Sequence, residues 1–304
     1  MLQDLHTQLQ GEQPVAVTAV AGMGGIGKTE LAIRYALGYW QAHYPAGVCW
    51  LRCRGAEMAS QVVEFATVEM GLVVPDGLTA EQQVRWCWRN WRPAGAVLVV
   101  LDDVTDYGAI ADYLPPVDLR FRVLMTTRSQ QLGASVRTVP LDLLSPEAAL
   151  ELLAELEGAG RVMTDRAAAA ELCDRLGNLP LGVELVGRYL RQKRNLSLEK
   201  MLERLENKGL RHRSLAERSP DMTGRRGVEA AIALSWEELQ REETRRLAYL
   251  LSLFALAPIP WGLVAGCLPD EDEEELEDAR DRLVNLSLVR RVDEGVYQLH
   301  QLVR

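Results

Sequence analysis

The sequence predicts an α/β fold with a parallel sheet, followed by an all-α helical segment and a last segment of helices and a hairpin. Two observations carry this prediction. In the first half, short apolar runs rich in β-branched residues alternate with stretches of helical spacing, a pattern typical of a parallel sheet covered on both faces. Beyond about residue 144 helical patterns take over, until two short strands flank residues 293–295.

Length and composition limit the architecture and the function. A chain of 304 residues holds about two domains of average size, or three small ones. Hydrophobic residues make up 48% and charged residues 25%, which excludes a disordered chain. The net charge of −9 argues against a generally basic nucleic-acid coat. We expect three domains: an α/β domain at 1–143, a helical domain at 144–215 and, because helices followed by a hairpin are typical of it, a winged-helix domain at 216–304.

The individual elements follow from the local patterns. The expected strands of the sheet are 14–20, 47–53, 96–101, 122–127 and, more weakly, 137–141. The expected helices between them are 30–40, 59–70 and 79–91. The helical domain is expected at 146–157, 164–176, 180–193 and 197–206. A polar, Arg-rich stretch at 208–227 is interpreted as a linker or exposed loop, and the last domain is expected to hold helices 228–239, 242–256, 261–267 and 271–285.

A glycine-rich segment follows the first expected strand and opens the first expected helix. It matches the pattern G-x-x-x-x-G-K-[ST], in which backbone N–H groups surround phosphate oxygens. Lys28 can reach the β- and γ-phosphates as a mobile positive charge, and the Thr29 hydroxyl suits Mg²⁺. The domain at 1–143 is therefore expected to be a P-loop nucleotide-binding domain. Its predicted nucleotide-binding residues are Gly22, Met23, Gly24, Gly25, Ile26, Gly27, Lys28, Thr29 and Glu30.

Charged residues follow the third and fourth expected strands. The third strand ends in Asp102 and Asp103, at the edge of the sheet where ligands bind in parallel-sheet folds. We expect Asp102, with Thr29, to hold Mg²⁺, and Asp103 to orient or deprotonate the attacking water. Arg128 follows the fourth strand, where it can sense the γ-phosphate. The predicted catalytic residues are therefore Lys28, Asp102, Asp103 and Arg128.

Taken together, these motifs resemble the NB-ARC nucleotide-binding module of STAND-class NTPases, the switch ATPases of plant disease-resistance receptors, apoptotic protease activators and bacterial regulators. The resemblance rests on G-M-G-G-I-G-K-T, L-V-V-L-D-D-V and V-L-M-T-T-R, on G-N-L-P-L at 177–181, which is similar to the family's G-x-P motif, and on L-H-Q at 299–301, which is similar to its Met-His-Asp motif. It implies that Pro180 packs against adenine and that His300 hydrogen-bonds the β-phosphate of ADP. Gln301 stands where the family has an acid.

The resemblance also implies an activity: a slow, Mg²⁺-dependent ATPase that works as a switch in signalling or defence. With ADP bound the module is expected to be closed and monomeric, and with ATP bound it is expected to open and self-associate. The expected cofactors are ADP or ATP and Mg²⁺, with adenine favoured because no N-K-x-D guanine motif is evident. The family adds an N-terminal effector and C-terminal sensor repeats, so the chain is expected to be either an excised core or a stand-alone switch.

Two other functions fit parts of the sequence. One is a DNA-binding ATPase or transcription regulator whose winged helix reads duplex DNA, and the other is a P-loop kinase that acts on a small molecule. Neither is favoured, because no basic recognition helix and no acceptor-site motif is evident. The Arg- and Trp-rich segment 85–92 is interpreted as a helix that packs its tryptophans on the sheet, rather than as a nucleic-acid platform.

Localisation is expected to be cytoplasmic, without membrane contact. The five cysteines form no disulfide pattern and are interpreted as buried, reduced thiols. No signal peptide is visible in residues 1–13. The uncharged run 247–268 is long enough to cross a bilayer, but prolines and glycines interrupt it, so it is interpreted as a buried helix followed by a turn.

Overall fold

The computed structural model describes residues 1–11, 13–19, 25–53, 58–117, 120–129, 132, 135–158, 160–210, 220–254, 258–269 and 271–299. These residues form two compact units. The N-terminal unit covers residues 1–142 and the C-terminal unit covers residues 143–304.

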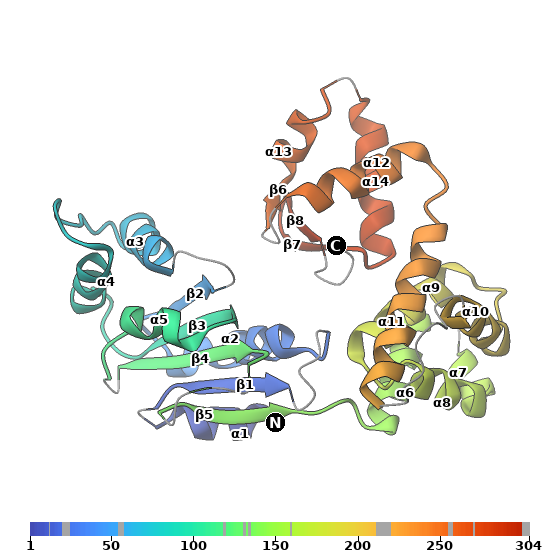
Figure 1. Ribbon diagram of the computed structural model, residues 1–304, viewed down its shortest axis with the longest axis horizontal. Coiled ribbons are helices and arrows are strands. Elements are labelled where there is room, and N and C mark those ends of the chain that lie inside the picture. The colour runs from blue at the N-terminus through green and yellow to red at the C-terminus, as the bar shows by residue number, and fades with distance from the viewer. Residues whose placement is uncertain are drawn as a thin grey trace. The chain divides into compact units, whose positions relative to one another are not determined.

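The N-terminal unit is built on a five-stranded parallel sheet in the order β2-β3-β4-β1-β5 (Figure 1). Its strands are β1 (Val15–Ala19), β2 (Val48–Arg52), β3 (Val97–Val104), β4 (Phe121–Thr127) and β5 (Arg137–Leu141). The central strands β3 and β4 are almost wholly buried, which explains why they read as continuous apolar runs. The predicted parallel sheet is therefore confirmed, although β3 continues past its predicted end at residue 101.

Helices cover both faces of this sheet. They are α1 (Leu2–Leu9), α2 (Lys28–His43), α3 (Met58–Val68), α4 (Ala80–Arg89), the short α5 (Tyr107–Ile110) and a 3-10 turn at Ala111–Tyr113. Alternate residues of β3 enter two separate cores: Leu98 and Val100 pack with α1 and α2, whereas Val97, Val99 and Leu101 pack with α3 and α4. The even-numbered residues of β3 up to Val100 therefore face α1 and α2, and the odd-numbered residues up to Leu101 face α3 and α4.

The helix α4 and the residues directly after it pack two tryptophans inward, as the sequence indicated. Trp88 and Trp91 are buried and stack with ring centroids 5.4 Å apart, while Arg85, Arg89 and Arg92 are exposed. Trp88 also donates a hydrogen bond from Nε1 to the Tyr113 carbonyl, at 2.9 Å. The tryptophans are thus part of the core, and no stacking platform for bases is formed by them.

The C-terminal unit consists of helices and one small sheet. Its helices are α6 (Pro146–Glu157), α7 (Arg161–Thr164), α8 (Arg166–Arg175), α9 (Pro180–Gln192), α10 (Leu198–Leu210), α11 (Pro220–Glu237), α12 (Glu242–Leu253), α13 (Trp261–Gly266) and α14 (Glu273–Asn285). The strands β6 (Ile259–Pro260), β7 (Val289–Asp293) and β8 (Val296–Leu299) form an antiparallel sheet in the order β6-β8-β7. The expected hairpin around residues 293–295 is therefore present.

The segment 208–227 corrects the sequence interpretation, which treated it as a linker. Residues 208–210 belong to α10 and residues 220–227 belong to α11, while 211–219 lie outside the described residues. Pro220 occupies the first residue of α11, a position that needs no N–H donor. Gly227 does not break the helix, because its missing side chain lets α11 lie against the end of α8: a Cβ there would collide with the backbone of Arg175 and Leu176.

A buried ion pair joins the helices at one end of α9. The Arg161 Nε atom lies 2.9 Å from Oε2 of Glu157, whose side chain has no exposed surface. The same guanidinium donates to three carbonyl oxygens at and beyond the end of α9, in Leu190, Lys193 and Leu196, at 2.7 to 3.1 Å. Arg161 thereby satisfies carbonyls that the helix itself leaves without donors.

Two sequence interpretations concern membranes and thiols. Within the part of the chain that the structure describes, no helix is both long and apolar enough to cross a membrane. The run 247–268 is divided between α12, β6 and α13.

The cysteines at 49, 53, 87 and 173 are buried free thiols, as predicted. Cys267, which directly follows α13, is exposed instead.

Candidate functional site

The glycine-rich loop ends in two glycines with positive φ directly before α2. Gly25 has φ of 81° and Gly27 has φ of 100°, conformations that residues with a Cβ rarely adopt. Gly27, which has no side chain, is the N-cap of α2, and the positive end of the helix dipole at this position favours an anion. Lys28, the first residue of α2, is only 8% exposed. Gly22, Met23 and Gly24 lie outside the described residues.

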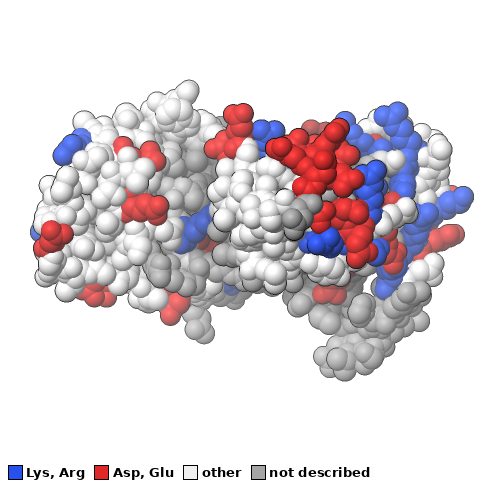
Figure 2. Space-filling model, turned by 90° about the horizontal axis from the view of Figure 1, so that it is seen from above, with Lys and Arg blue, Asp and Glu red and all other residues white. Residues whose placement is uncertain are grey.

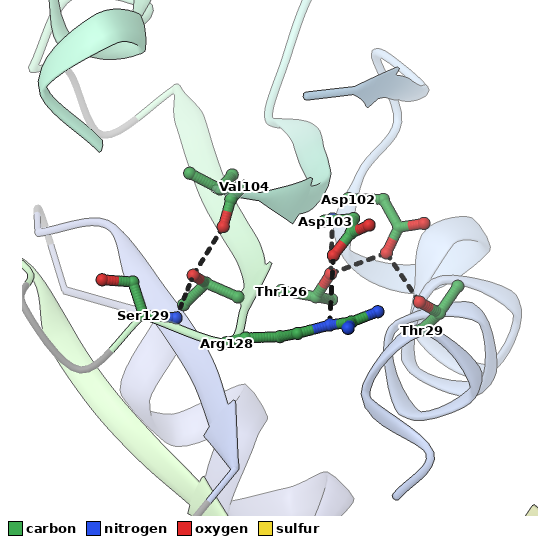
Figure 3. Close-up of polar contacts among 8 residues, drawn as sticks. Thr29, Asp102, Asp103, Val104, Thr126, Arg128 and Ser129 are labelled. Carbon is green, nitrogen blue, oxygen red and sulfur yellow. Dashed lines mark hydrogen bonds and ion pairs between the residues drawn. The ribbon is translucent and has the colours of Figure 1, made fainter. Parts of the chain in front are cut away.

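The two acids lie where β3 loses its regular pairing. Asp102 is still in register with Arg52 of β2, whereas the pairing of β3 with β4 shifts between Leu101 and Val104. Asp103 lies in this irregularity with φ of 57°, which Asp tolerates better than most residues. In a regular strand, consecutive side chains point to opposite faces. Here both carboxylates lie side by side at the carboxyl end of the sheet (Figure 3).

A threonine of β4 connects the two acids. The Thr126 hydroxyl donates to Oδ1 of Asp102 at 2.6 Å and accepts the backbone N–H of Asp103 at 2.8 Å. The Thr29 hydroxyl of α2 donates to the same Asp102 oxygen at 2.8 Å (Figure 3). Three elements that are distant in sequence therefore converge on one carboxylate oxygen.

The role of Thr126 was not predicted from the sequence. It continues the alternation of Leu124 on β4, which faces the same core as α1 and α2. A hydroxyl at that position, one residue before the end of a buried strand, was the available signal. The neighbouring Thr127 faces the other way, with its hydroxyl bound to the Val104 carbonyl at 2.6 Å.

Positive and negative charges alternate across this edge of the sheet. Nε of Arg128 lies 3.8 Å from Oδ1 of Asp103. Burial, with repulsion from Arg128, lowers the pKa of Lys28, while Asp103 and Asp102 oppose that shift. Two cations held near each other against burial and mutual repulsion are suited to bind a polyanion, because its charge would compensate both.

The side-chain oxygen atoms at this edge of the sheet also fit as ligands of a magnesium ion. Mg²⁺ prefers a few carboxylate and hydroxyl oxygens together with water and phosphate oxygens. The Thr29 hydroxyl and the Asp102 carboxylate are such donors, and their 2.8 Å hydrogen bond shows that they reach the same point in space. The residues present therefore fit the ion that the sequence analysis expected.

The other predicted site residues make different contacts, belong to the C-terminal unit or lie outside the described residues. Ile26 is buried, and Glu30 on the first turn of α2 pairs with Arg34 at 2.8 Å. Pro180 is the first residue of α9 in the C-terminal unit. His300 and Gln301 lie outside the described residues.

Comparison with known proteins gives this geometry a context. Residues 1–162 match the NB-ARC domain family. The chain is 30% identical over 95% of its length to the regulatory protein AfsR of Streptomyces griseus, and 28% identical over 100% of its length to the protein of the same name from Streptomyces coelicolor. It spans 29% and 30% of the length of these relatives.

The fold is also similar to that of a solved multidomain protein from Pyrococcus horikoshii. That protein is described as a Signal Transduction ATPase with Numerous Domains (STAND) with a tetratricopeptide repeat sensor. The TM-score is 0.63 over 100% of this chain and 41% of that chain, at 19% sequence identity. At this identity the likeness concerns the fold alone.

Proposed function

Because the chain belongs to the NB-ARC family of STAND-class P-loop NTPases, we propose that it is an adenine-nucleotide switch that hydrolyses ATP slowly. ADP holds a closed monomer, and ATP holds an open state that self-associates in signalling or defence. The observation that carries the proposal is the convergence of Thr29, Thr126 and Asp102 beside Lys28 and Arg128.

In the proposed reaction each residue of this network has one task. Lys28 and the N-terminus of α2 bind the β- and γ-phosphates, and Thr29 and Asp102 hold Mg²⁺. When bound, Mg²⁺ supplies neutralisation of the charge on the phosphate oxygens. Asp103 orients the attacking water and accepts its proton, and Arg128 contacts the γ-phosphate. The ion pair between Arg128 and Asp103 supports a link between γ-phosphate contact and orientation of the water.

The C-terminal unit completes the proposed switch. We assign a winged-helix fold to its last part, on the basis of the chain order α12, β6, α13, α14, β7, β8 and of the antiparallel β6-β8-β7 sheet. Pro180 is proposed to contact adenine and His300 to contact the β-phosphate of ADP. The name of the two curated relatives, regulatory protein AfsR, is consistent with a regulatory role rather than a metabolic one.

Binding of this domain to DNA is not favoured by its surface. The helix α14 begins with Glu273, Glu274 and Glu275, and Asp278 and Asp281 on later turns are also exposed. Figure 2, which views the molecule from above, shows a dense group of Asp and Glu. Such a surface repels the phosphate backbone that supplies most non-specific affinity for DNA.

Nucleotide content after gentle purification tests the proposal. The protein is denatured and the released nucleotide is separated by chromatography, in parallel with His300→Ala and with the control Gln298→Ala, which alters a residue of β8. We expect near-stoichiometric ADP in the parent and in Gln298→Ala, and loss of ADP or exchange for ATP in His300→Ala. A parent that retains no nucleotide under any condition would contradict the switch.

Replacing Thr126 by valine should separate hydrolysis from binding. Thr126→Val keeps the shape but removes the hydroxyl that orients Asp102 and accepts the Asp103 N–H. We expect kcat for ATP hydrolysis to fall roughly tenfold, because a hydrogen bond to a charged group is lost and the carboxylates are less well oriented. The affinity for ADP should change less than about twofold, since Thr126 makes no phosphate contact in this scheme.

The matched control for this variant is Thr127→Val, which removes a buried hydroxyl from the next position of the same strand. Its hydroxyl is bound to the Val104 carbonyl on the opposite face. We expect Thr127→Val to lower the melting temperature while kcat stays near the parent value. Equal losses of kcat in both variants would show that general loosening of β4, rather than the contact to Asp102, sets the rate.

A further inference from the structure

Arg52, the last residue of β2, lies beside the proposed phosphate site but has no role in it so far. Along β2, Val48 and Trp50 pack with the core of α1 and α2, and Cys49 and Leu51 pack with the opposite core. Arg52 continues the series of Val48 and Trp50. Its side chain therefore belongs to the face of the sheet that carries α2.

The register of the sheet puts Arg52 next to Asp102. The two residues are direct partners in the pairing of β2 with β3, and Asp102 continues the alternation of Leu98 and Val100 on the same face. Partners in a parallel register project their side chains to the same side. Arg52 and Asp102 thus extend β2 and β3 toward the same edge, the one at which Thr29 contacts Asp102.

The backbone of Arg52 is fixed in place by a side chain of α3. The Gln61 amide accepts the Arg52 N–H at 2.8 Å and donates to the Arg52 carbonyl at 2.6 Å. In this way Gln61 supplies the contacts that a further strand would make, since β2 is the first strand in the order of the sheet. The end of β2 is therefore held rigidly where the arginine begins.

The guanidinium itself is not satisfied by the described part of the chain. Its Nη1 atom is buried and has no hydrogen-bond partner among the described residues. Burial lowers the pKa of Arg52, and the negative charge of Asp102 opposes that shift, so the two groups interact. Buried donors normally have an acceptor, and an arginine that lacks one at a binding edge is available to a ligand.

The strand order indicates which part of a nucleotide this arginine can reach. The phosphate loop follows β1, which is three strand spacings of about 4.8 Å away from β2, too far for an arginine side chain to bridge. The acids of β3 and Arg128 after β4 lie between them. A phosphate group within reach of Arg52 must therefore lie in front of β3 and β4, at the outer end of the phosphate chain.

We propose that Arg52 binds the γ-phosphate of ATP and makes the site discriminate a nucleoside triphosphate from a diphosphate. This inference rests on the proposed nucleotide-binding function. A planar guanidinium can donate two parallel hydrogen bonds to a phosphate, so Arg52 would complement Arg128 from the opposite side. ADP, which lacks the terminal group, would leave Arg52 without this contact.

Equilibrium binding of two nucleotides to the full chain tests the inference. The protein is stripped of nucleotide, and the dissociation constants of Mg²⁺–ADP and of a non-hydrolysable Mg²⁺–ATP analogue are measured by calorimetry. We expect Arg52→Gln to lower the affinity for the ATP analogue about tenfold, because a charge-assisted hydrogen bond is lost. Its affinity for ADP should change less than about twofold. The affinity of Arg52→Lys for the ATP analogue should lie between those of the parent and Arg52→Gln. Lysine keeps the positive charge but lacks the planar guanidinium that donates two parallel hydrogen bonds.

The matched control is Arg122→Gln. Arg122 is also half-buried with an Nη1 atom that is buried and unpartnered among the described residues, and it lies on the same face in β4. Its register partner is Leu98, at the other end of β3 from Asp102. We expect Arg122→Gln to bind both nucleotides as the parent does, and the melting temperatures of all variants report whether they fold.

The outcomes separate this inference from the proposed function. A parent that binds neither nucleotide overturns the proposed function itself. If the parent binds both nucleotides, and Arg52→Gln weakens the binding of both equally or of neither, then only the proposed role of Arg52 is overturned. If Arg52→Gln does not fold, Arg52→Lys decides, since an unchanged ratio of ATP to ADP affinity in that variant contradicts recognition by the guanidinium fork.

Discussion

Lys28→Met is expected to weaken binding of both ADP and ATP by about a hundredfold, because it removes the cation that contacts the phosphates of either nucleotide. Lys28 is 8% exposed, so the methionine side chain can occupy the space of the aliphatic stem. The variant therefore changes charge with little change of packing. Calorimetric titration of nucleotide-free protein with Mg²⁺–ADP and with a non-hydrolysable Mg²⁺–ATP analogue measures the effect.

The stability of the empty protein provides the control for Lys28→Met. Burial and Arg128 both lower the pKa of Lys28, so the empty site holds this charge at a cost. We expect the nucleotide-free variant to melt no lower than the parent, whereas added ADP should raise the melting temperature of the parent only. Lys200→Met, which alters an exposed lysine of α10, should behave as the parent. Undiminished ADP affinity in Lys28→Met would contradict a phosphate-binding role.

The local sequence was informative where one physical requirement dominates. The parallel sheet could be predicted because β3 and β4 are buried on both faces and must be apolar throughout. The glycine-rich loop could be predicted because positive φ at Gly25 and Gly27 requires glycine there. In both cases the residue type follows from the backbone and needs no knowledge of distant contacts.

The remaining features depend on contacts between segments that are distant in sequence. The helix α1 was not predicted, because only Leu5 and Leu9 in a polar stretch mark its buried face. The helical start of α11 was mistaken for a linker, because the use of Gly227 depends on the backbone of α8. Thr126 and Arg52 could not be assigned to the site from the sequence, because only the register of the strands places them beside Asp102.

Arg161→Met is expected to lower the free energy of unfolding of the C-terminal unit by about 3–5 kcal/mol, the range for removal of one partner of a buried ion pair. The Glu157 side chain has no exposed surface and would lose the guanidinium at 2.9 Å. The carbonyls of Leu190, Lys193 and Leu196 would lose a shared donor as well. Urea denaturation of the full chain, followed by circular dichroism, measures the change.

A double variant identifies which of these losses dominates. Combining Arg161→Met with Glu157→Leu removes the buried carboxylate, so the double variant should be more stable than Arg161→Met if the uncompensated charge is the main cost. It should still be less stable than the parent, because the three carbonyls remain without Arg161. Arg175 supplies the control: its exposed side chain pairs with the exposed Glu171 and Glu206, so Arg175→Met should cost about 1 kcal/mol or less. If Arg161→Met costs no more than this control, the ion pair and the carbonyl contacts do not stabilise the end of α9.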